Sequence, residues 1–276
     1  FLHPAFQFNG DELGFWIAKY EPTADEGVAS GTSSCLSADN TISKTVKILP
    51  GETSWICIDV SNAFNVSLQM KDKTDIYGWL PEEVDTHMLT NQEWGAVAYL
   101  SKSKYGAHEE EVWINNSSSA ITGCAGNSVS ASSTSGCQNA YHTENGQKAS
   151  TTHNIYGVYD MSGGAREYVM GNLNNTVASS GFASSSVIAE INNKYINRYT
   201  SNNGLIYGDA VYETSSGTDG SNSWYSDYSY FITASGPWFH RGASWVDGTG
   251  AGVFSFYYTI GSAFSRHSFR PALVPL

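Results

Sequence analysis

The fold of this chain is decided near its end, where residues 237–276 read PWFHRGASWVDGTGAGVFSFYYTIGSAFSRHSFRPALVPL. Aromatic and aliphatic residues alternate with small ones through residues 253–258, and this period of two predicts a half-buried strand. Residues 269–274 predict a second strand. We expect it near a sheet edge, because Pro271 has no N–H to donate to a neighbouring strand. Residues 259–268 lack any such period and predict an exposed loop on a rigid frame.

Two arginines of this segment, Arg241 and Arg270, lie among small and apolar residues in a chain with only 14% charged residues. A guanidinium in such surroundings must be paired or hydrogen-bonded, because an uncompensated buried charge costs several kcal/mol. We interpret both arginines as structural anchors tied to a carboxylate or to loop carbonyls, with ligand recognition as the alternative. Asp160 and Glu167 are natural carboxylate partners for them.

The length of 276 residues allows either two domains or one large α+β domain with long loops. The chain has no visible repeat of fixed period and little sign of a linker, so we expect one domain over residues 1–276. Stretches rich in Ser, Thr, Asn and Gly at about 107–152 and 172–222 predict large loop insertions.

The charge balance limits the partners. Lys and Arg number 14 against 26 Asp and Glu, a formal net charge of −12, and the basic residues do not cluster. Nucleic acid is excluded as a partner because its phosphates require a basic surface, and an anionic membrane surface is excluded for the same reason. No apolar run approaches the roughly 20 residues that a spanning helix needs, so we expect no membrane insertion.

The chain contains four cysteines, Cys35, Cys57, Cys124 and Cys137. They form no Cys-x-x-Cys pair and no zinc-finger spacing with histidine, so no metal site is predicted. Cys124 and Cys137 bracket a loop of small polar residues that burial cannot hold together, and a disulfide there would contribute about 3 kcal/mol. Cys35 with Cys57 is the second candidate bond. Either disulfide would indicate an oxidising, extracellular environment.

The clearest local signal is a capping box from Thr90 to Glu93, whose hydroxyl and carboxylate each satisfy one unpaired amide of a first helical turn. It predicts a helix over about residues 91–103 with one buried face. Glu93 as a catalytic acid is the alternative, but the capping spacing already explains the residue. Ser61 predicts the start of another helix, which runs to Met70.

Residues 224–231, WYSDYSYF, are dense in aromatic side chains. Rings on both faces of such a segment suit packing on one side and a sugar-stacking or protein-binding patch on the other. Burial in the core is the simpler interpretation.

Three stretches, in this order, resemble the formylglycine-generating-enzyme (sulfatase-modifying factor) family. Residues 88–94, MLTNQEW, resemble its R-L-P-T-E-A-E-W. Residues 154–169, NIYGVYDMSGGAREYV, resemble N-x-x-G-L-Y-D-M-x-G-N-V-W-E-W-V, although Gly164 and Arg166 replace the usual Asn and Trp. RGASW at 241–245 and SFR at 268–270 resemble the closing motifs R-G-G-S-W and G-F-R. The resemblance implies an α+β chain with a C-type-lectin-like fold of the formylglycine-generating-enzyme type, with two or more helices around small antiparallel sheets and long irregular loops.

Further phrases resemble a branch of that family without enzyme activity, the variable ligand-binding proteins of diversity-generating retroelements in phages and bacteria. They are HPAF at residues 3–6, EWGA at 93–96, SKSKYG at 101–106 and DMSGGA at 160–165. In that branch the C-terminal loop is rewritten at adenine-containing codons while the scaffold stays constant. Carried over by position, the variable region is about residues 241–270, and its ligand-binding set comprises Ser244, Val246, Gly250, Tyr257, Thr259, Ile260, Ser262, Phe264, Arg266 and His267.

The resemblance does not extend to enzyme activity. The active enzymes hold copper with a pair of cysteine thiolates near the C-terminal motif, and this chain has no cysteine after Cys137. SFRP at residues 268–271 stands where G-F-R-C is expected. A hydrolytic site that uses His240 and His267 near Asp247 is the alternative. We therefore predict no enzyme and no cofactor, while the Asp/Asn-rich loops leave room for a structural calcium ion.

The residue types of the C-terminal segment favour binding instead. Tyr, Trp, Phe, Arg and His set among Gly and Ser resemble an antibody paratope, in which rings provide contact area and small residues let a loop adapt. We predict a non-catalytic ligand- or receptor-binding protein on a virion surface or a bacterial cell surface, either a phage receptor-binding protein or an adhesin. Its expected partner is a protein or glycan of a host surface, and the sequence is compatible with a homo-oligomer. A structural virion or pilus-tip subunit is the alternative.

Overall fold

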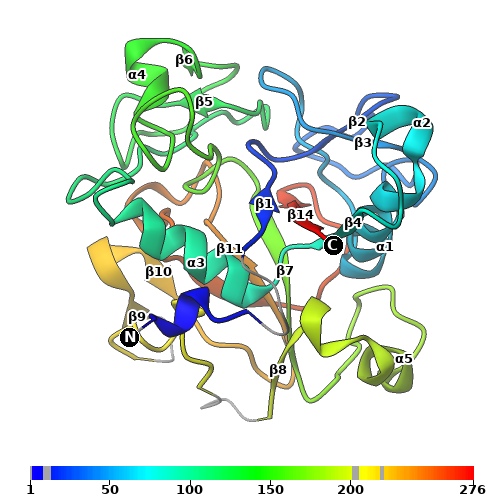
Figure 1. Cartoon of the computed structure of the whole chain (residues 1–276). Helices are drawn as coiled ribbons and strands as arrows, with labels where there is room; N and C mark the ends of the chain where they lie inside the picture. Colours follow the sequence, from blue (N-terminus) through cyan, green and yellow to red (C-terminus); the bar gives the residue numbers. More distant parts are fainter. Residues whose placement is uncertain (1, 9–13, 201–204, 218–220) are drawn as a thin grey trace.

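The computed structural model describes residues 2–8, 14–200, 205–217 and 221–276. Within them, short helices and strands are joined by long irregular connections, so the chain belongs to the mixed α+β class (Figure 1). The helices are α1 (Val60–Gln69), α2 (Thr74–Tyr77), α3 (Asn91–Ser101), α4 (Glu144–Gln147) and α5 (Ser185–Glu190), with 3-10 turns η1 (Pro4–Phe6), η2 (Met70–Asp72), η3 (Asn193–Tyr195), η4 (Trp224–Ser226) and η5 (Gly248–Gly250).

The strands form one larger and one smaller sheet and two separate pairs. They are β1 (Trp16–Ile17), β2 (Thr23–Ala24), β3 (Val46–Lys47), β4 (Val84–Met88), β5 (Cys124–Ala125), β6 (Asn139–Ala140), β7 (Arg166–Leu173), β8 (Asn197–Tyr199), β9 (Ser221–Asn222), β10 (Tyr228–Ser229), β11 (Trp238–Arg241), β12 (Phe256–Thr259), β13 (His267–Phe269) and β14 (Pro271–Pro275). The larger sheet has the order β13-β7-β11-β12-β10-β9, and β8 also pairs with β7. The smaller sheet has the order β1-β14-β4, while β2 pairs with β3 and β5 with β6.

Strand β7 lies at the centre of the fold, because its side chains are buried on both faces of the sheet. Tyr168 and Met170 belong to one apolar cluster, which α1 completes with Phe64. Val169 belongs to another cluster, which α3 completes with Trp94. The two helices thus cover opposite faces of the same strand (Figure 1). The middle of a strand covered on both faces is expected to be apolar, as Tyr168, Val169 and Met170 are, although the polar Glu167 and Asn172 of β7 are buried as well.

Helix α3 begins where the capping box predicts. The Thr90 side chain accepts a hydrogen bond from the Glu93 amide at 3.2 Å, and Glu93 Oε2 accepts one from the Thr90 amide at 2.7 Å. The other carboxylate oxygen of Glu93 lies 2.8 Å from His87 Nε2. Glu93 is therefore fully engaged in holding the start of α3 and is buried away from any pocket that the C-terminal segment lines.

Helix α1 begins one residue before the predicted cap, so the assignment of Ser61 as cap was wrong. Asp59 has extended backbone angles and its Oδ1 accepts from the Asn62 amide at 2.8 Å, whereas Ser61 lies inside the first turn. An ionised carboxylate at this position accepts strongly from the free amides of the turn. The helix ends at Gln69 rather than Met70, where the chain tightens into η2.

The C-terminal segment supplies strands to both sheets, and three predictions about it were wrong. The loop predicted at residues 259–268 is shorter, because Thr259 ends β12 and His267 begins β13. The alternation at residues 253–258 is only partly a strand: β12 starts at Phe256, and Phe254 is buried in a turn where its amide donates to Asp227 Oδ2 at 2.9 Å. Strand β14 is central and not at an edge, since it lies between β1 and β4. Pro271 opens β14, and only its carbonyl is used, by the Ala18 amide at 3.1 Å. The missing N–H therefore costs nothing.

Arg270 is paired as the sequence predicts. Its Nε donates to Glu167 Oε2 at 2.8 Å and its Nη2 pairs with the other oxygen of the same carboxylate. The remaining donors reach the carbonyls of Ala18 at 2.7 Å and Tyr159 at 2.9 Å. This fully buried, two-pronged ion pair ties β7 to the junction of β13 and β14 and to the N-terminal segment.

Arg241 has no carboxylate hydrogen-bond partner among the described residues, so its predicted pairing with Asp160 or Glu167 was wrong. Asp160 instead accepts from the Asn115 amide group and the Gly123 backbone. Strand β11 places Arg241 beneath the first turn of α3 and the loop at 209–210. The donors of its guanidinium reach Ser255 O at 3.0 Å, Asn91 Oδ1 at 2.6 Å, Asp209 O at 3.0 Å and Ala210 O at 3.2 Å.

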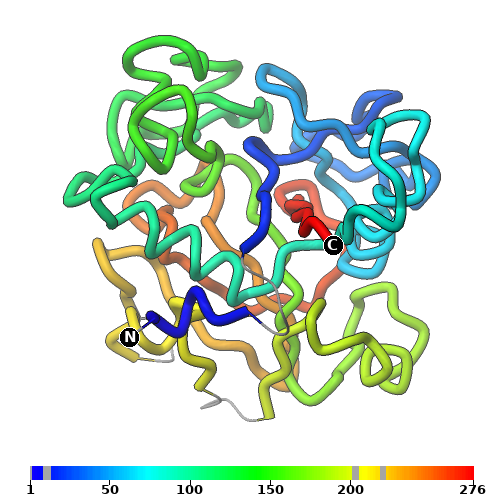
Figure 2. The backbone as a smooth tube through the Cα atoms, in the orientation of Figure 1, coloured from blue at the N-terminus to red at the C-terminus, as the bar shows by residue number. Residues whose placement is uncertain are grey.

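Both candidate disulfides are present in the structure, Cys35 with Cys57 and Cys124 with Cys137. The second closes part of the irregular segment at residues 107–152, which gathers on one side of the molecule and contains only the short β5-β6 pair and α4 (Figure 2). Among the described residues, no helix is both long enough and apolar enough to cross a bilayer.

Candidate binding surface

A pocket of about 330 Å³ lies where strands of the larger sheet meet the loop that follows β11. Cross-strand pairing sets its walls: His240 of β11 lies opposite Tyr257 of β12, and β10 pairs alongside β12 to bring in Tyr228. Arg166 enters from the start of β7. The described lining residues are Arg166, Tyr228, His240, Ala243, Asp247, Gly250, Ser255 and Tyr257.

A continuous row of rings crosses this part of the sheet. The ring centroids of Tyr228 and Tyr257 are 5.4 Å apart, and those of Tyr257 and His240 are also 5.4 Å apart. The row continues from His240 to His267 at 5.1 Å and from His267 to Phe264 at 5.2 Å. The row therefore links the pocket to the exposed loop between β12 and β13, and its exposed or partly exposed members, Tyr228, Tyr257 and Phe264, offer aromatic contact area at low entropy cost.

Both histidines of this row are neutral at pH 7. Burial lowers the pKa of His240 well below its usual value, and the nearby Arg166 lowers it further. Burial lowers the pKa of His267 to about 3, helped by Arg166 and Arg266. His267 Nδ1 lies 2.6 Å from the Tyr168 hydroxyl, which fixes the ring. The two imidazoles therefore act as packing and hydrogen-bonding groups and carry no charge to a ligand.

Arg166 and Asp247 form the polar side of the pocket, and each keeps about a quarter of its side chain exposed. Arg166 Nη2 donates to both oxygens of Asp247 at 3.2 Å. Oδ2 of Asp247 also accepts from the amide and the hydroxyl of Ser244, at 2.7 and 2.8 Å. The turn at residues 244–247 thus holds the carboxylate in place and the carboxylate holds the guanidinium at the pocket.

The predicted ligand-binding residues differ in their exposure. Val246, Ile260 and Phe264 are exposed, with 44%, 44% and 46% of their surfaces accessible. Gly250, Tyr257, Ser262 and Arg266 are partly exposed, and Gly250 and Tyr257 line the pocket. Ser244, Thr259 and His267 are buried.

These three buried members act through their neighbours. Ser244 holds Asp247, while the Thr259 hydroxyl accepts from the Gly261 amide at 3.2 Å at the turn into the exposed loop. His267 supports Phe264 from beneath in the row of rings. Any contact that they make with a ligand therefore requires these neighbours to move.

The residues considered for copper binding or for hydrolysis are not arranged as those reactions require. All four cysteines are in disulfides, so no thiolate pair remains to hold copper. Within the described part of the chain, neither His240 nor His267 hydrogen-bonds Asp247, and no serine hydroxyl bonds either ring. The described residues also contain no group of three or more His, Cys, Asp or Glu that could hold a metal ion.

Six of the described lining residues were not among the predicted ligand-binding residues: Arg166, Tyr228, His240, Ala243, Asp247 and Ser255. Two of them, Arg166 and Tyr228, had left a signal in the sequence. Arg166 stands where the resembled family usually has a tryptophan, and this replacement of an apolar residue by a charged one was a sign of a polar role. Tyr228 belongs to the ring-dense segment at residues 224–231, which we expected mainly in the core. Strand β10 instead leaves it partly exposed against Tyr257.

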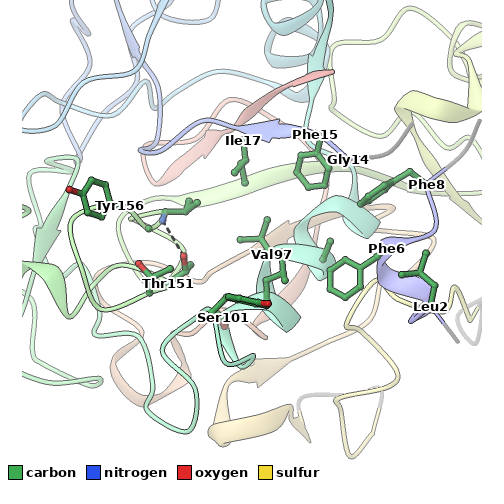
Figure 3. A pocket seen from close by; sticks show the side chains of 16 residues that line it. Leu2, Phe6, Phe8, Gly14, Phe15, Ile17, Val97, Ser101, Thr151 and Tyr156 are labelled. Carbon is green, nitrogen blue, oxygen red and sulfur yellow. Dashed lines mark hydrogen bonds between the residues drawn. The ribbon is translucent and has the colours of Figure 1, made fainter. Parts of the chain in front are cut away.

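A second, larger pocket of about 510 Å³ lies elsewhere, between the N-terminal segment, α3 and the loop at residues 151–158 (Figure 3). Its walls are mainly apolar, with Phe6, Phe8 and Phe15 gathered at one end and Thr151 and Tyr156 at the other. None of the predicted ligand-binding residues is among its described lining.

No family model matches the chain, and a search of curated proteins finds no match either. Among solved structures, the chain is similar to one described as "Major Tropism Determinant P3c Variant", with 14% sequence identity and a TM-score of 0.39. The match covers 95% of this chain and 50% of that one, so the chain spans about half of its length.

Proposed function

We propose that the chain is a non-catalytic binding protein with a C-type-lectin-like fold that presents the side chains of residues 241–270 to a macromolecule on a host surface. The motifs at residues 88–94, 154–169 and 241–270 support the fold, and the residue types of the C-terminal segment support binding. We further propose that it acts outside the cell, as a phage receptor-binding protein or a bacterial adhesin. The two disulfides are in keeping with such an environment.

One observation carries the proposal: buried frame and exposed side chains alternate within a single short segment. Arg241, Phe256 and Arg270 are fully buried and tie the segment into both sheets. Between them, Ile260 and Phe264 project from the β12–β13 loop with almost half of their surfaces exposed. Large apolar side chains held on a rigid frame but left in solvent are typical of a recognition surface.

The experiment that tests this function measures adhesion of the purified, fluorescently labelled chain to a panel of bacterial cells by flow cytometry. Phe264→Ala and Ile260→Ala should each reduce adhesion about tenfold, since truncation of an anchor ring or side chain at an interface costs more than about 1 kcal/mol. Their unfolding midpoints should stay near that of the unchanged protein, because about half of each side chain is already in solvent.

Tyr156→Ala is the matched control, since Tyr156 is 88% exposed and lies outside the C-terminal segment. It should adhere like the unchanged protein. Full adhesion by both loop variants, or a loss confined to the Tyr156 variant, would place recognition elsewhere and refute the proposal.

Diversification of the segment is a separate part of the proposal, and it is tested by the flanking DNA. We expect a near-copy of the codons for about residues 241–270 that differs mainly at adenines, together with a reverse-transcriptase gene. Absence of both would leave a binding protein of constant specificity.

A further inference from the structure

Arg166 has more hydrogen-bond donors than the protein uses. A guanidinium carries five N–H groups in a planar fork, and here only Nη2 has acceptors, both on Asp247. Among the described residues, neither Nε nor Nη1 has an acceptor, and because Nε is buried, Nη1 is the vacant donor left for a ligand. A planar fork with vacant donors beside a pocket is the group that proteins use to bind a carboxylate.

The acceptor beside it is also incompletely used. Asp247 Oδ2 receives three donors, but Oδ1 receives only Arg166 Nη2 at 3.2 Å. A carboxylate oxygen accepts at least two hydrogen bonds, so Oδ1 has room for a hydroxyl donor. The polar side of the pocket therefore combines vacant donors for an anion with a vacant acceptor for a hydroxyl group.

The opposite side of the pocket is made of rings. Tyr257 stacks between Tyr228 and His240, with interplanar angles of 27° and 17° and centroid separations of 5.4 Å, so the rings are nearly parallel but offset and each leaves part of its face uncovered. The uncovered part of an aromatic face packs against the C–H face of a sugar ring while the sugar hydroxyls remain free for polar partners. The volume of about 330 Å³ is at the low end of the range of small-molecule sites, about 300–1,000 Å³, which suits one ring and not a longer chain.

The local charge favours an anion even though the whole chain is acidic. The backbone amide of Arg166 donates to the Arg266 carbonyl at 2.7 Å, so the two arginines start from neighbouring positions on β7 and beside β13. Both lower the pKa of His267, which places their positive charges on this part of the molecule. Asp247 is the one acidic residue in the described lining of the pocket.

Building on the proposed function, we propose that this pocket binds a single acidic sugar residue, with its carboxylate on Arg166, a hydroxyl on Asp247 and its ring on Tyr257. The combination distinguishes an acidic sugar from an acidic peptide. A Glu or Asp side chain would use Arg166 but has neither a ring face for Tyr257 nor hydroxyl groups for Asp247.

The test titrates the intact protein with acidic saccharides and their neutral matches by isothermal calorimetry. Sialyllactose is paired with lactose, and trigalacturonate with its methyl ester, so that each pair differs in the carboxylate. At least one acid should bind about tenfold or more tightly than its match, as expected for a charge-assisted hydrogen bond. Equal binding of the pair, binding of neither acid, or tighter binding of tetraglutamate would overturn the proposal.

Substitutions identify the site. Arg166→Gln should weaken binding of the acidic saccharide about tenfold and leave binding of its neutral match unaffected. Arg166→Lys keeps the charge but not the fork, so its affinity for the acid should lie between those of Arg166→Gln and the unchanged protein. Tyr257→Ala should weaken binding of both the acidic saccharide and its neutral match. Lys47→Gln removes one positive charge from a surface ion pair on β3 and should leave the affinity for both saccharides unchanged. Unchanged affinity of Arg166→Gln would overturn the assignment, and a thermal unfolding curve for each variant checks that it is folded.

The outcome is separable from that of the proposed function. If cell adhesion requires Phe264 but is indifferent to Arg166 and to added acidic sugar, the binding function stands and the acidic-sugar site is wrong. If the acid binds through Arg166 but no loop variant affects adhesion, the pocket stands and the wider surface is wrong.

Discussion

The buried carboxyl groups around Arg270 lead to a sharp prediction about pH. Glu21, Asp160 and Glu167 are all buried beside this single guanidinium, with at most 1% of their surfaces exposed. Glu167 holds the two-pronged pair with Arg270, so we assign it the negative charge. Glu21 accepts only from neutral groups, such as the Ala165 amide at 2.8 Å. Burial raises the pKa of Glu21 well above its ordinary value, and the charges of Asp160 and Glu167 raise it further.

The sign of the effect follows from proton binding. In the unfolded chain Glu21 loses its proton near pH 4.5, whereas in the folded chain it keeps the proton to a higher pH. Above pH 4.5 the folded state therefore binds more protons, and Glu21 makes the protein less stable as the pH rises towards its folded pKa. For one group the slope is at most about 1.4 kcal/mol per pH unit, and it applies between the ordinary pKa and the raised pKa of the folded state.

Glu21→Gln removes this contribution, because glutamine does not ionise and its side-chain oxygen can still accept from Ala165. The free energy of unfolding, measured by urea titration at pH 4.5, 5.5 and 6.5 with the disulfides intact, should fall less steeply with pH in the variant. The difference between variant and unchanged protein should grow as the pH rises, in favour of the variant and by at most about 1.4 kcal/mol per pH unit.

Glu26→Gln serves as the control, since Glu26 is exposed and its variant should follow the profile of the unchanged protein. Parallel profiles for Glu21→Gln and the unchanged protein would mean that Glu21 is ionised when folded, and the assignment of the proton would be refuted.

Two further predictions concern the frame that holds the binding surface. Arg241→Met leaves Asn91 and three buried backbone carbonyls without their donor. It should therefore lower the free energy of unfolding, measured by urea titration, by about 3–5 kcal/mol. A loss below about 1 kcal/mol would mean that water or a shifted side chain replaces the guanidinium. Thr90→Ala removes half of the capping box of α3 and should lower the free energy of unfolding by about 1 kcal/mol, whereas Thr90→Ser should lower it much less. Equal losses in the two variants would show that the hydroxyl does not stabilise the start of the helix.

Several features could be predicted from local sequence because neighbouring residues alone produce them. The Thr90–Glu93 capping box places the start of α3, since both of its bonds lie within one turn. The polar composition between Cys124 and Cys137 indicates a loop that needs a covalent closure, which the structure contains. The apolar surroundings of Arg270 require that its charge be paired, although its partner, Glu167, lies 103 residues away in sequence. In each case the requirement is set by the residue and its near neighbours.

Other features required the tertiary structure. Whether the strand that contains Pro271 lies at an edge of the sheet depends on which strands pair with it. Its partners β1 and β4 are both far away in sequence. The carbonyl partners of Arg241 come from loops 14 to 32 residues away, and Asn91 from 150 residues away. No sequence pattern encodes such distances.

The candidate pocket illustrates the same division. The sequence by itself determined that the C-terminal segment mixes a rigid frame with rings and small residues, because side-chain type and spacing are local properties. Only the tertiary structure decided that Arg166 of β7 and Tyr228 of β10 join Tyr257 at one pocket, while Ser244, Thr259 and His267 turn inward. The reason is that strand order and register, which are set by long-range packing on β7, decide which side chains meet and which face solvent.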